Sequence, residues 1–179
     1  MNPPRRAVTI ALGSNLGDRA GALRAALHLL DEQPRIRVRA ASAFHETAAV
    51  TLPGDDAQQP AYLNACALVQ TTLPAPSFLE VLLGVERALG RVRARGARWA
   101  PRIIDLDLLL DGDTIIDLPG LVVPHPRMHE RRFVLAPLAE IAPDAIHPVL
   151  GKTIRALLDD LDSASGARPA TVISTVVPD

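Results

Sequence analysis

The stretch RIIDLDLLLD, residues 102–111, predicts a β-strand in which acidic and apolar side chains alternate. Residues two apart on a strand share a face, so Asp105 and Asp107 point one way. By the same rule Ile104, Leu106, Leu108 and Leu110 are expected to point the other way. Aspartate is disfavoured in strands, so an acidic pair on one face indicates a site with a role of its own.

The acidic pair is suited to a cation. The two side chains start about 6.6 Å apart along a strand, and their carboxylates can converge on one or two ions. Magnesium prefers such hard oxygen ligands and completes its shell with water and substrate phosphates. We therefore expect Asp105 and Asp107 to be magnesium ligands, and a solvated strand face remains the alternative.

Arginine crowds the segment just before this strand. Its members are Arg91, Arg93, Arg95, Arg98 and Arg102. Like charges on one loop repel each other unless an anion gathers them, and the planar guanidinium fork suits phosphate oxygens. Next to the carboxylate pair, a bound polyphosphate is favoured over a solvated basic loop. Trp99, among these arginines, is expected either to stack on a flat ligand or to plug the loop against the core.

Hydrophobic periodicity predicts the other elements. We expect strands at 7–12, 35–47 and 62–72, helices at 19–31 (capped by Asp18), 74–89 and 153–161, a hairpin at 115–123, and a helix at 128–141 interrupted near Pro137. Residues 48–60 and 90–101 are expected to be long loops. The order strand–helix–strand–strand–helix–strand is the ferredoxin-like pattern. It predicts an α+β sandwich, with an antiparallel sheet, helices on its face and added C-terminal helices.

Bulk properties limit the class of protein. A chain of 179 residues, 48% hydrophobic, predicts a single domain over 1–179, with a core at about 7–161 and a weakly specified tail at 162–179. A net charge of -1 gives no general attraction to nucleic acid. The single cysteine, Cys66, excludes an internal disulfide. No segment approaches the roughly 20 apolar residues of a membrane span, and we expect a cytoplasmic protein.

Two more clusters carry polar side chains. On the strand at 62–72, Tyr62, Asn64 and Cys66 share one face, and the amide of Asn64 can read the donor and acceptor edge of a heterocycle. His125 lies between two prolines, which hold it rigidly, either in a site or in a structural turn. From the residues alone, a magnesium–phosphate enzyme, a magnesium-dependent nucleotidyltransferase that releases pyrophosphate and a non-catalytic binding module remain open.

Longer stretches resemble one family, the 6-hydroxymethyl-7,8-dihydropterin pyrophosphokinases. The matching segments are ALGSNLGD (11–18), YLNA (62–65), GRVR (90–93), RWAPRIIDLDLLL (98–110), VPHP (123–126) and RRFVLAPLAEIAP (131–143). They keep the family's order over most of residues 7–150. The resemblance implies transfer of pyrophosphate from ATP to the hydroxymethyl-dihydropterin, giving AMP and the pterin diphosphate. It also implies a monomer that uses two magnesium ions.

The resemblance implies a role for each matching residue. Asp105 and Asp107 are similar to the family's metal ligands, and Arg91 and Arg102 to its catalytic, phosphate-handling arginines. The ATP side would comprise Glu86, Arg93, Arg98, Trp99, His125 and Arg131. The pterin pocket would comprise Thr47, Tyr62, Asn64 and Phe133, with Tyr62 and Phe133 as the stacking pair. The chain departs from the family at Ala48-Ala49, where prolines are common, at an extra residue near Arg95, and at His129, where lysine is common.

Overall fold

The computed structural model describes residues 4–48, 60–91, 102–165 and 171–173. The strands in this part of the chain are β1 (Arg6–Ser14), β2 (Ile36–Ala41), β3 (Phe44–Thr47), β4 (Tyr62–Thr71), β5 (Asp105–Asp111), β6 (Ile116–Leu118), β7 (Leu121–Val123), β8 (Ile146–His147), β9 (Lys152–Thr153) and β10 (Thr171–Ile173). The helices are α1 (Arg19–Asp31), α2 (Ala75–Ala88), α3 (Arg132–Ile141) and α4 (Ile154–Ser165), with a 3-10 turn, η1, at Met128–Glu130. None of these helices has the length and apolar character needed to cross a membrane.

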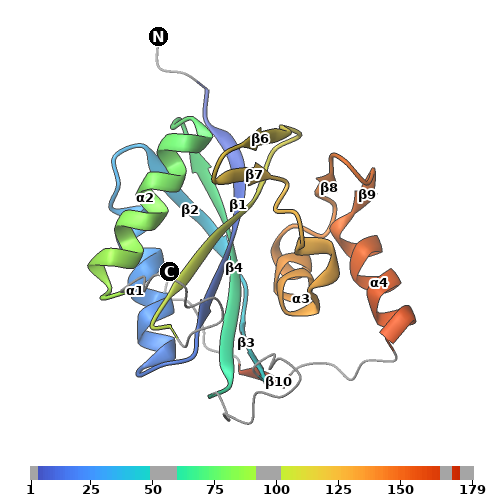
Figure 1. The fold of residues 1–179 in the computed structure, drawn as a ribbon, viewed down its shortest axis with the longest axis horizontal. Coiled ribbons are helices and arrows are strands. Elements are labelled where there is room, and N and C mark those ends of the chain that lie inside the picture. Colours follow the sequence, from blue (N-terminus) through green and yellow to red (C-terminus); the bar gives the residue numbers. More distant parts are fainter. Residues whose placement is uncertain (1–3, 49–59, 92–101, 166–170, 174–179) are drawn as a thin grey trace.

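The main sheet is antiparallel and has β4 and β1 at its centre. Its order is β10-β3-β4-β1-β5, and β2 also pairs with β4. Helices α1 and α2 cover one face of the sheet, and α3 and α4 lie on the other (Figure 1). This confirms the predicted α+β architecture of an antiparallel sheet with helices, including the added C-terminal helices.

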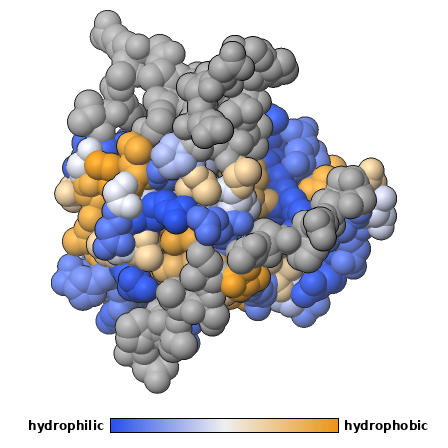
Figure 2. Space-filling view, turned by 90° about the horizontal axis from the view of Figure 1, so that it is seen from below, coloured by the Kyte–Doolittle hydropathy of each residue, from blue (hydrophilic) through white to orange (hydrophobic). Residues whose placement is uncertain are grey.

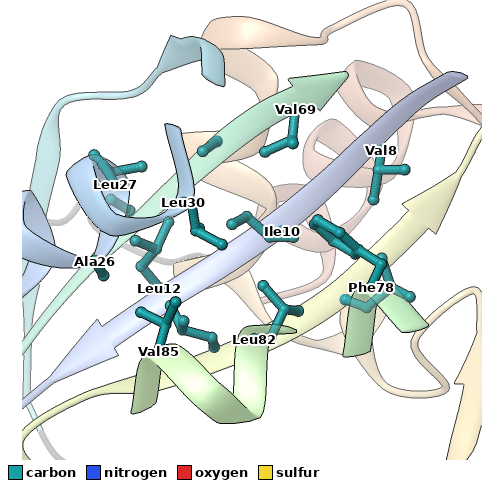
Figure 3. Packing of buried hydrophobic residues seen from close by; sticks show 14 of the residues in the cluster. Val8, Ile10, Leu12, Ala26, Leu27, Leu30, Val69, Phe78, Leu82 and Val85 are labelled. Atoms are coloured by element: carbon teal, nitrogen blue, oxygen red, sulfur yellow. The ribbon is translucent and has the colours of Figure 1, made fainter. Parts of the chain in front are cut away.

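Each face of the sheet has its own hydrophobic core. Alternate residues of β1, namely Val8, Ile10 and Leu12, pack against Leu30 of α1 and Leu82 of α2, as Figure 3 shows. The second core lies under α3 and α4 and includes Cys66, Leu109, Leu135, Leu138 and Ile154. Because helices cover both faces of the sheet, polar side chains can gather only where its strands begin or end.

The expected strand at 35–47 is two strands, because the chain breaks its ladder at Ser42 and Ala43. The hydroxyl of Ser42 accepts the backbone N–H of Cys66 at 3.0 Å. The backbone N–H of Ala43 donates to the carboxylate of Glu140 in α3 at 2.8 Å. These side-chain contacts replace strand pairing, so β2 and β3 follow one another along β4.

A bulge in β5 changes the predicted direction of one side chain. Thr9 pairs with Leu110 and Ile10 pairs with Leu108, so Leu109 is the extra residue. A bulged residue shifts the alternation beyond it by one place. Leu110 therefore packs in the second core, not with Leu106 and Leu108 as the sequence predicted.

The segment at 128–141 is interrupted earlier than predicted. Arg131 has an extended backbone (φ -115°, ψ 101°) between η1 and α3, whereas Pro137 lies inside the continuous helix α3. The predicted hairpin at 115–123 is confirmed by the pairing of β6 with β7. The last helix, α4, ends at Ser165, four residues beyond the expected Leu161, and the short β8–β9 hairpin before it was not predicted.

Candidate active site

A cavity of about 460 Å³ opens at the end of the sheet where β4 and β5 begin. It is lined by Ala11, Leu12, Gly13, Thr47, Ala48, Tyr62, Asn64, Ala65, Arg91, Arg102, Asp105, Asp107, His125, Pro126, Arg127, Arg131, Phe133 and Val134. Figure 2 looks onto this end of the molecule, and strongly hydrophilic residues cross the middle of the face between apolar patches.

Ten of the residues singled out in the sequence line this one cavity. They are Thr47, Tyr62, Asn64, Arg91, Arg102, Asp105, Asp107, His125, Arg131 and Phe133. They come from β3, β4, β5 and α3, from the residues just after α2 and just before β5, and from the segment around η1. Arg93, Arg98 and Trp99 lie outside the described residues. Glu86 is not among the lining residues and lies behind Arg91.

The carboxylate of Asp105 is held by two arginines from opposite sides. One oxygen accepts from the Arg91 guanidinium and the other accepts from the Arg102 guanidinium. Arg91 also contacts the carboxylate of Glu86. Charges of opposite sign therefore alternate along the cavity wall, and two guanidinium groups are positioned where an anionic ligand would meet them.

Asn15, in the turn after β1, fixes the start of β5. Its side-chain oxygen accepts the backbone N–H of Arg102 at 2.7 Å, and the backbone N–H of Asn15 donates to the Arg102 carbonyl at 3.1 Å. Asn15 is 1% exposed. The sequence analysis missed this residue, because the partner lies 87 residues away and no local pattern links the two.

Asp107, like Asp105, is a half-buried member of the acidic pair. Burial, followed by the negative charge of Asp105, raises the pKa of Asp107 to about 6, against an opposing effect of Arg131. Desolvation disfavours the charged form of a carboxyl group, and a neighbouring carboxylate adds to this. A cation placed between the two side chains would relieve both effects.

The two carboxylates of Asp105 and Asp107 are a suitable donor set for a magnesium ion that also binds phosphate. Among the described residues, no cluster of three or more His, Cys, Asp or Glu side chains could enclose a metal ion. Asp105 and Asp107 nevertheless line the same cavity from one strand face. Magnesium is commonly held by one or two carboxylates together with water and substrate phosphates, so a pair beside arginines is a suitable donor set.

On the other wall, Thr47 orients the amide of Asn64. The Asn64 Nδ2 donates to the Thr47 hydroxyl at 2.8 Å, which leaves the Asn64 side-chain oxygen near Gly13. A Cβ added to Gly13 would lie 3.4 Å from that oxygen. The absence of a side chain at Gly13 thus lets the Asn64 amide lie close to the backbone of β1. The sequence alone did not point to this role.

Aromatic side chains from two elements border the same part of the cavity. Tyr62 begins β4 and Phe133 lies in the first turn of α3. Burial raises the pKa of the Tyr62 hydroxyl, so this ring stays neutral. The Arg131 guanidinium lies 5.9 Å from the centre of the Phe133 ring, within the range of a cation–π contact. Flat apolar rings beside an oriented amide suit a planar heterocycle.

His125 has a defined tautomer. Its Nδ1 accepts the backbone N–H of Arg127 at 3.2 Å, so the ring proton must be on Nε2. The backbone N–H of His125 donates to the Leu109 carbonyl at 2.9 Å. Burial, followed by the positive charge of Arg131, lowers the pKa of His125 to about 4. At neutral pH the ring is therefore an uncharged hydrogen-bond donor.

Arg127 is a further basic residue of the cavity that the sequence analysis missed. Its guanidinium is paired with Glu130 at 3.0 Å, and its side chain is 54% exposed. The sequence feature that could have indicated this role is the position of Arg127 two residues after His125.

Comparison with known proteins gives a consistent result. The family model of 7,8-dihydro-6-hydroxymethylpterin-pyrophosphokinase (HPPK) matches residues 9–143. A 2-amino-4-hydroxy-6-hydroxymethyldihydropteridine pyrophosphokinase of Methylorubrum extorquens is 45% identical over 153 residues, which cover 86% of this chain and 92% of the relative. Its counterpart in Bacillus subtilis is 46% identical over 132 residues, covering 74% of this chain and 75% of the relative.

Solved structures show the same fold. The Plasmodium falciparum HPPK-DHPS with pterin and p-hydroxybenzoate has a TM-score of 0.71 at 18% identity. The match covers 92% of this chain, which spans only 44% of that longer chain. The resemblance noted in the sequence is confirmed by the family match and by both relatives. This chain belongs to the 7,8-dihydro-6-hydroxymethylpterin-pyrophosphokinase (HPPK) family.

Proposed function

We propose that this chain transfers the pyrophosphoryl group of ATP to the hydroxymethyl group of 6-hydroxymethyl-7,8-dihydropterin, in folate biosynthesis. The products are AMP and the pterin diphosphate. The single observation that carries the proposal is the convergence in one cavity of an acidic pair, two arginines and an aromatic wall with an oriented amide. Family membership supports the same activity.

The acidic side of the cavity is assigned to ATP and magnesium. Asp105 and Asp107 would hold two magnesium ions, which supply charge neutralisation on the phosphates when bound. Arg91 and Arg102 would leave Asp105 and bind phosphate oxygens, stabilising negative charge that develops during transfer. Phosphoryl transfer depends mostly on such positioning and electrostatics. Arg93, Arg98, Trp99, His125 and Arg131 are assigned to ATP on the family resemblance, with Glu86 behind them.

The aromatic side is assigned to the pterin. Tyr62 and Phe133 would stack on its ring, and Asn64, oriented by Thr47, would read its polar edge. In this arrangement the hydroxymethyl group would point toward the ATP phosphates, which the magnesium ions held by Asp105 and Asp107 would bind. The alcohol gives up its proton to a phosphate oxygen as its own oxygen attacks the β-phosphorus. The bond between the β-phosphorus and the oxygen that bridges to the α-phosphorus breaks, and AMP leaves with this bridging oxygen. Water must be excluded, because it would compete as the nucleophile.

The test is a nucleotide product assay. Purified protein is incubated with ATP, magnesium and the hydroxymethyl-dihydropterin, and nucleotides are separated by chromatography. AMP in equal amount to pterin diphosphate is expected. Release of pyrophosphate with an adenylylated product would indicate a nucleotidyltransferase, and ADP would indicate ordinary γ-phosphoryl transfer. Nucleotide binding that does not depend on magnesium, without turnover, would indicate a binding module.

The broader assignments of domain, oligomeric state, location, partners and topology start from the sequence. We propose that residues 1–179 form a single domain that acts as a monomer in the cytoplasm, without a nucleic-acid or membrane partner. We also propose the ferredoxin-like topology. The antiparallel order β5-β1-β4 followed by β2 and β3 supports it. Light scattering on a size-exclusion column checks the oligomeric state.

A further inference from the structure

Glu86 is a buried acid that faces the site from behind. It lies in the last turn of α2, and its residue is 1% exposed. Carboxylates are rarely buried so completely unless their charge is paired. Glu86 is not among the residues that line the cavity, and within the described part of the chain it lies behind Arg91.

One carboxylate oxygen of Glu86 contacts both the strand β5 and the side chain of Arg91. Oε1 accepts the backbone N–H of Leu106 at 2.9 Å, and Leu106 stands between Asp105 and Asp107. The same atom contacts the Arg91 guanidinium. The backbone N–H of Arg91 also donates to the Glu86 carbonyl at 3.0 Å. Glu86 therefore joins the end of α2 to the strand that carries Asp105 and Asp107.

We propose that Glu86 is a positioning residue that holds Arg91 at the phosphates while Asp105 binds magnesium. The proposal rests on the assignment of magnesium to Asp105 made above. Arg91 contacts both Asp105 and Glu86, but only Asp105 lines the cavity. When Asp105 turns to a cation, Glu86 remains as the buried partner that keeps Arg91 in place.

The negative charge of Glu86 is the essential property in this arrangement. Without that charge, Arg91 would depend on Asp105 as its ionic partner in this network and would compete with the cation for that carboxylate. Charge-assisted contacts are stronger than neutral ones, so an amide at the Glu86 position would be the weaker partner. Groups behind a metal ligand commonly change metal affinity or activity by about 10–100-fold when altered. A shift in metal demand is therefore the expected signature.

Two variants separate the charge from the strand contact. Glu86→Gln keeps an oxygen that can accept the Leu106 N–H but loses the charge, whereas Glu86→Met loses both. Glu80→Gln, an exposed position on the same helix, is the matched control. Manganese is the probe for metal binding: its affinity for the complex of the protein with a non-hydrolysable ATP analogue is measured by electron paramagnetic resonance. Steady-state kinetics and thermal unfolding are measured on the same samples.

For Glu86→Gln we expect the manganese dissociation constant to rise and kcat to fall, each by about 10-fold. The KM for the pterin should stay within about twofold, because the aromatic wall is untouched. The melting temperature should match that of Glu80→Gln. Wild-type manganese affinity and kcat in Glu86→Gln would overturn the proposal. Equal losses in Glu86→Gln and Glu86→Met that follow their melting temperatures would also overturn it, since they indicate a purely structural role.

A double-mutant cycle keeps the inference testable if a single variant folds poorly. Because Glu86 acts through Arg91, adding Glu86→Gln to Arg91→Met should cause no further change in manganese affinity. Additive effects on manganese affinity would contradict the proposal. If Glu86→Gln folds poorly, the milder Glu86→Asp variant, which keeps the charge, takes its place in the cycle. Failure of the proposed function would instead be seen in the wild type, as a nucleotide product other than AMP.

Discussion

Asp107 follows Asp105 by two residues on β5, and both line the same cavity, but within the described part of the chain it is Asp105 that forms ion pairs with Arg91 and Arg102. Burial and the negative charge of Asp105 together raise the pKa of Asp107 to about 6. The pair is thus unequal: one carboxylate is paired with two guanidinium groups, whereas burial and a neighbouring carboxylate disfavour the ionised form of the other. This inequality gives a prediction with a defined sign.

Asp107→Asn should make the metal-free protein more stable at neutral pH. The folded pKa of about 6 lies above the ordinary value of 3.8, so the folded chain holds this proton more tightly than the unfolded chain. Ionising Asp107 therefore lowers the free energy of unfolding as pH rises between these values. We expect a gain of about 1–3 kcal/mol at neutral pH, shrinking toward zero as the pH falls toward 4. Urea denaturation measures it, and turnover should be lost.

The exposed Asp113→Asn, just beyond β5, is the control for this measurement. It removes the same charge from the chain without a buried carboxyl group. A stability gain in Asp107→Asn that does not change with pH would contradict the interpretation. Retained turnover would contradict the metal assignment. Added magnesium should stabilise the wild type more than the variant, because ligand binding to the folded state adds to its stability.

Gly13→Ala should weaken pterin binding without unfolding the protein. The added Cβ would lie 3.4 Å from the Asn64 side-chain oxygen, at the close end of van der Waals contact, so the amide that contacts Thr47 is displaced by at most a few tenths of an ångström. Small misplacements of positioning groups are costly, and we expect the pterin KM to rise about tenfold. The KM for ATP should be unchanged. Ala7→Ser, at the exposed start of β1, is the control, and an equal effect on both substrates would count against this role for Gly13.

Local patterns in the sequence were sufficient for much of the fold. Helix α1 has the predicted bounds, and the Asp18 side chain caps it by accepting the backbone N–H of Gly21 at 2.9 Å. The alternation in β5 places Asp105 and Asp107 together as predicted, since both precede the bulge at Leu109. These features depend on residues a few positions apart, which periodicity and capping rules describe.

Contacts between distant segments account for what the sequence analysis missed. The break between β2 and β3 depends on Glu140, 97 residues beyond Ala43. Glu140 also contacts His45 at 2.6 Å and so ties α3 to β3. The position of Glu86 behind Arg91 depends on how α2 packs on β5, and no spacing rule encodes that. Arg93, Arg98 and Trp99 keep their predicted roles as proposals, because they lie outside the described residues.

Leu82→Ala should destabilise the protein without altering its chemistry. Leu82 of α2 is fully buried against β1 (Figure 3), and it is not among the residues that line the cavity. Truncating such a side chain leaves a void and commonly costs about 2–5 kcal/mol. Chemical denaturation should show this loss, and kcat at a temperature where the variant is folded should match the wild type. Glu80→Ala, on the exposed side of the same helix, should lose far less stability. A large fall in kcat would mean that the packing of this core also determines the geometry of the cavity residues.

His125→Gln should retain more activity than His125→Leu. The ring is neutral at physiological pH because its pKa is lowered to about 4, and its proton is on Nε2 because Nδ1 accepts the Arg127 N–H. A glutamine amide can replace that neutral donor, whereas leucine cannot. We expect the KM for ATP to rise about tenfold in the leucine variant and clearly less in the glutamine variant, since one hydrogen bond is lost. Both variants should keep the wild-type dependence of kcat on pH between about 6 and 8. A wild-type ionisation near pH 6.5 that disappears in both variants would show instead that His125 titrates during turnover.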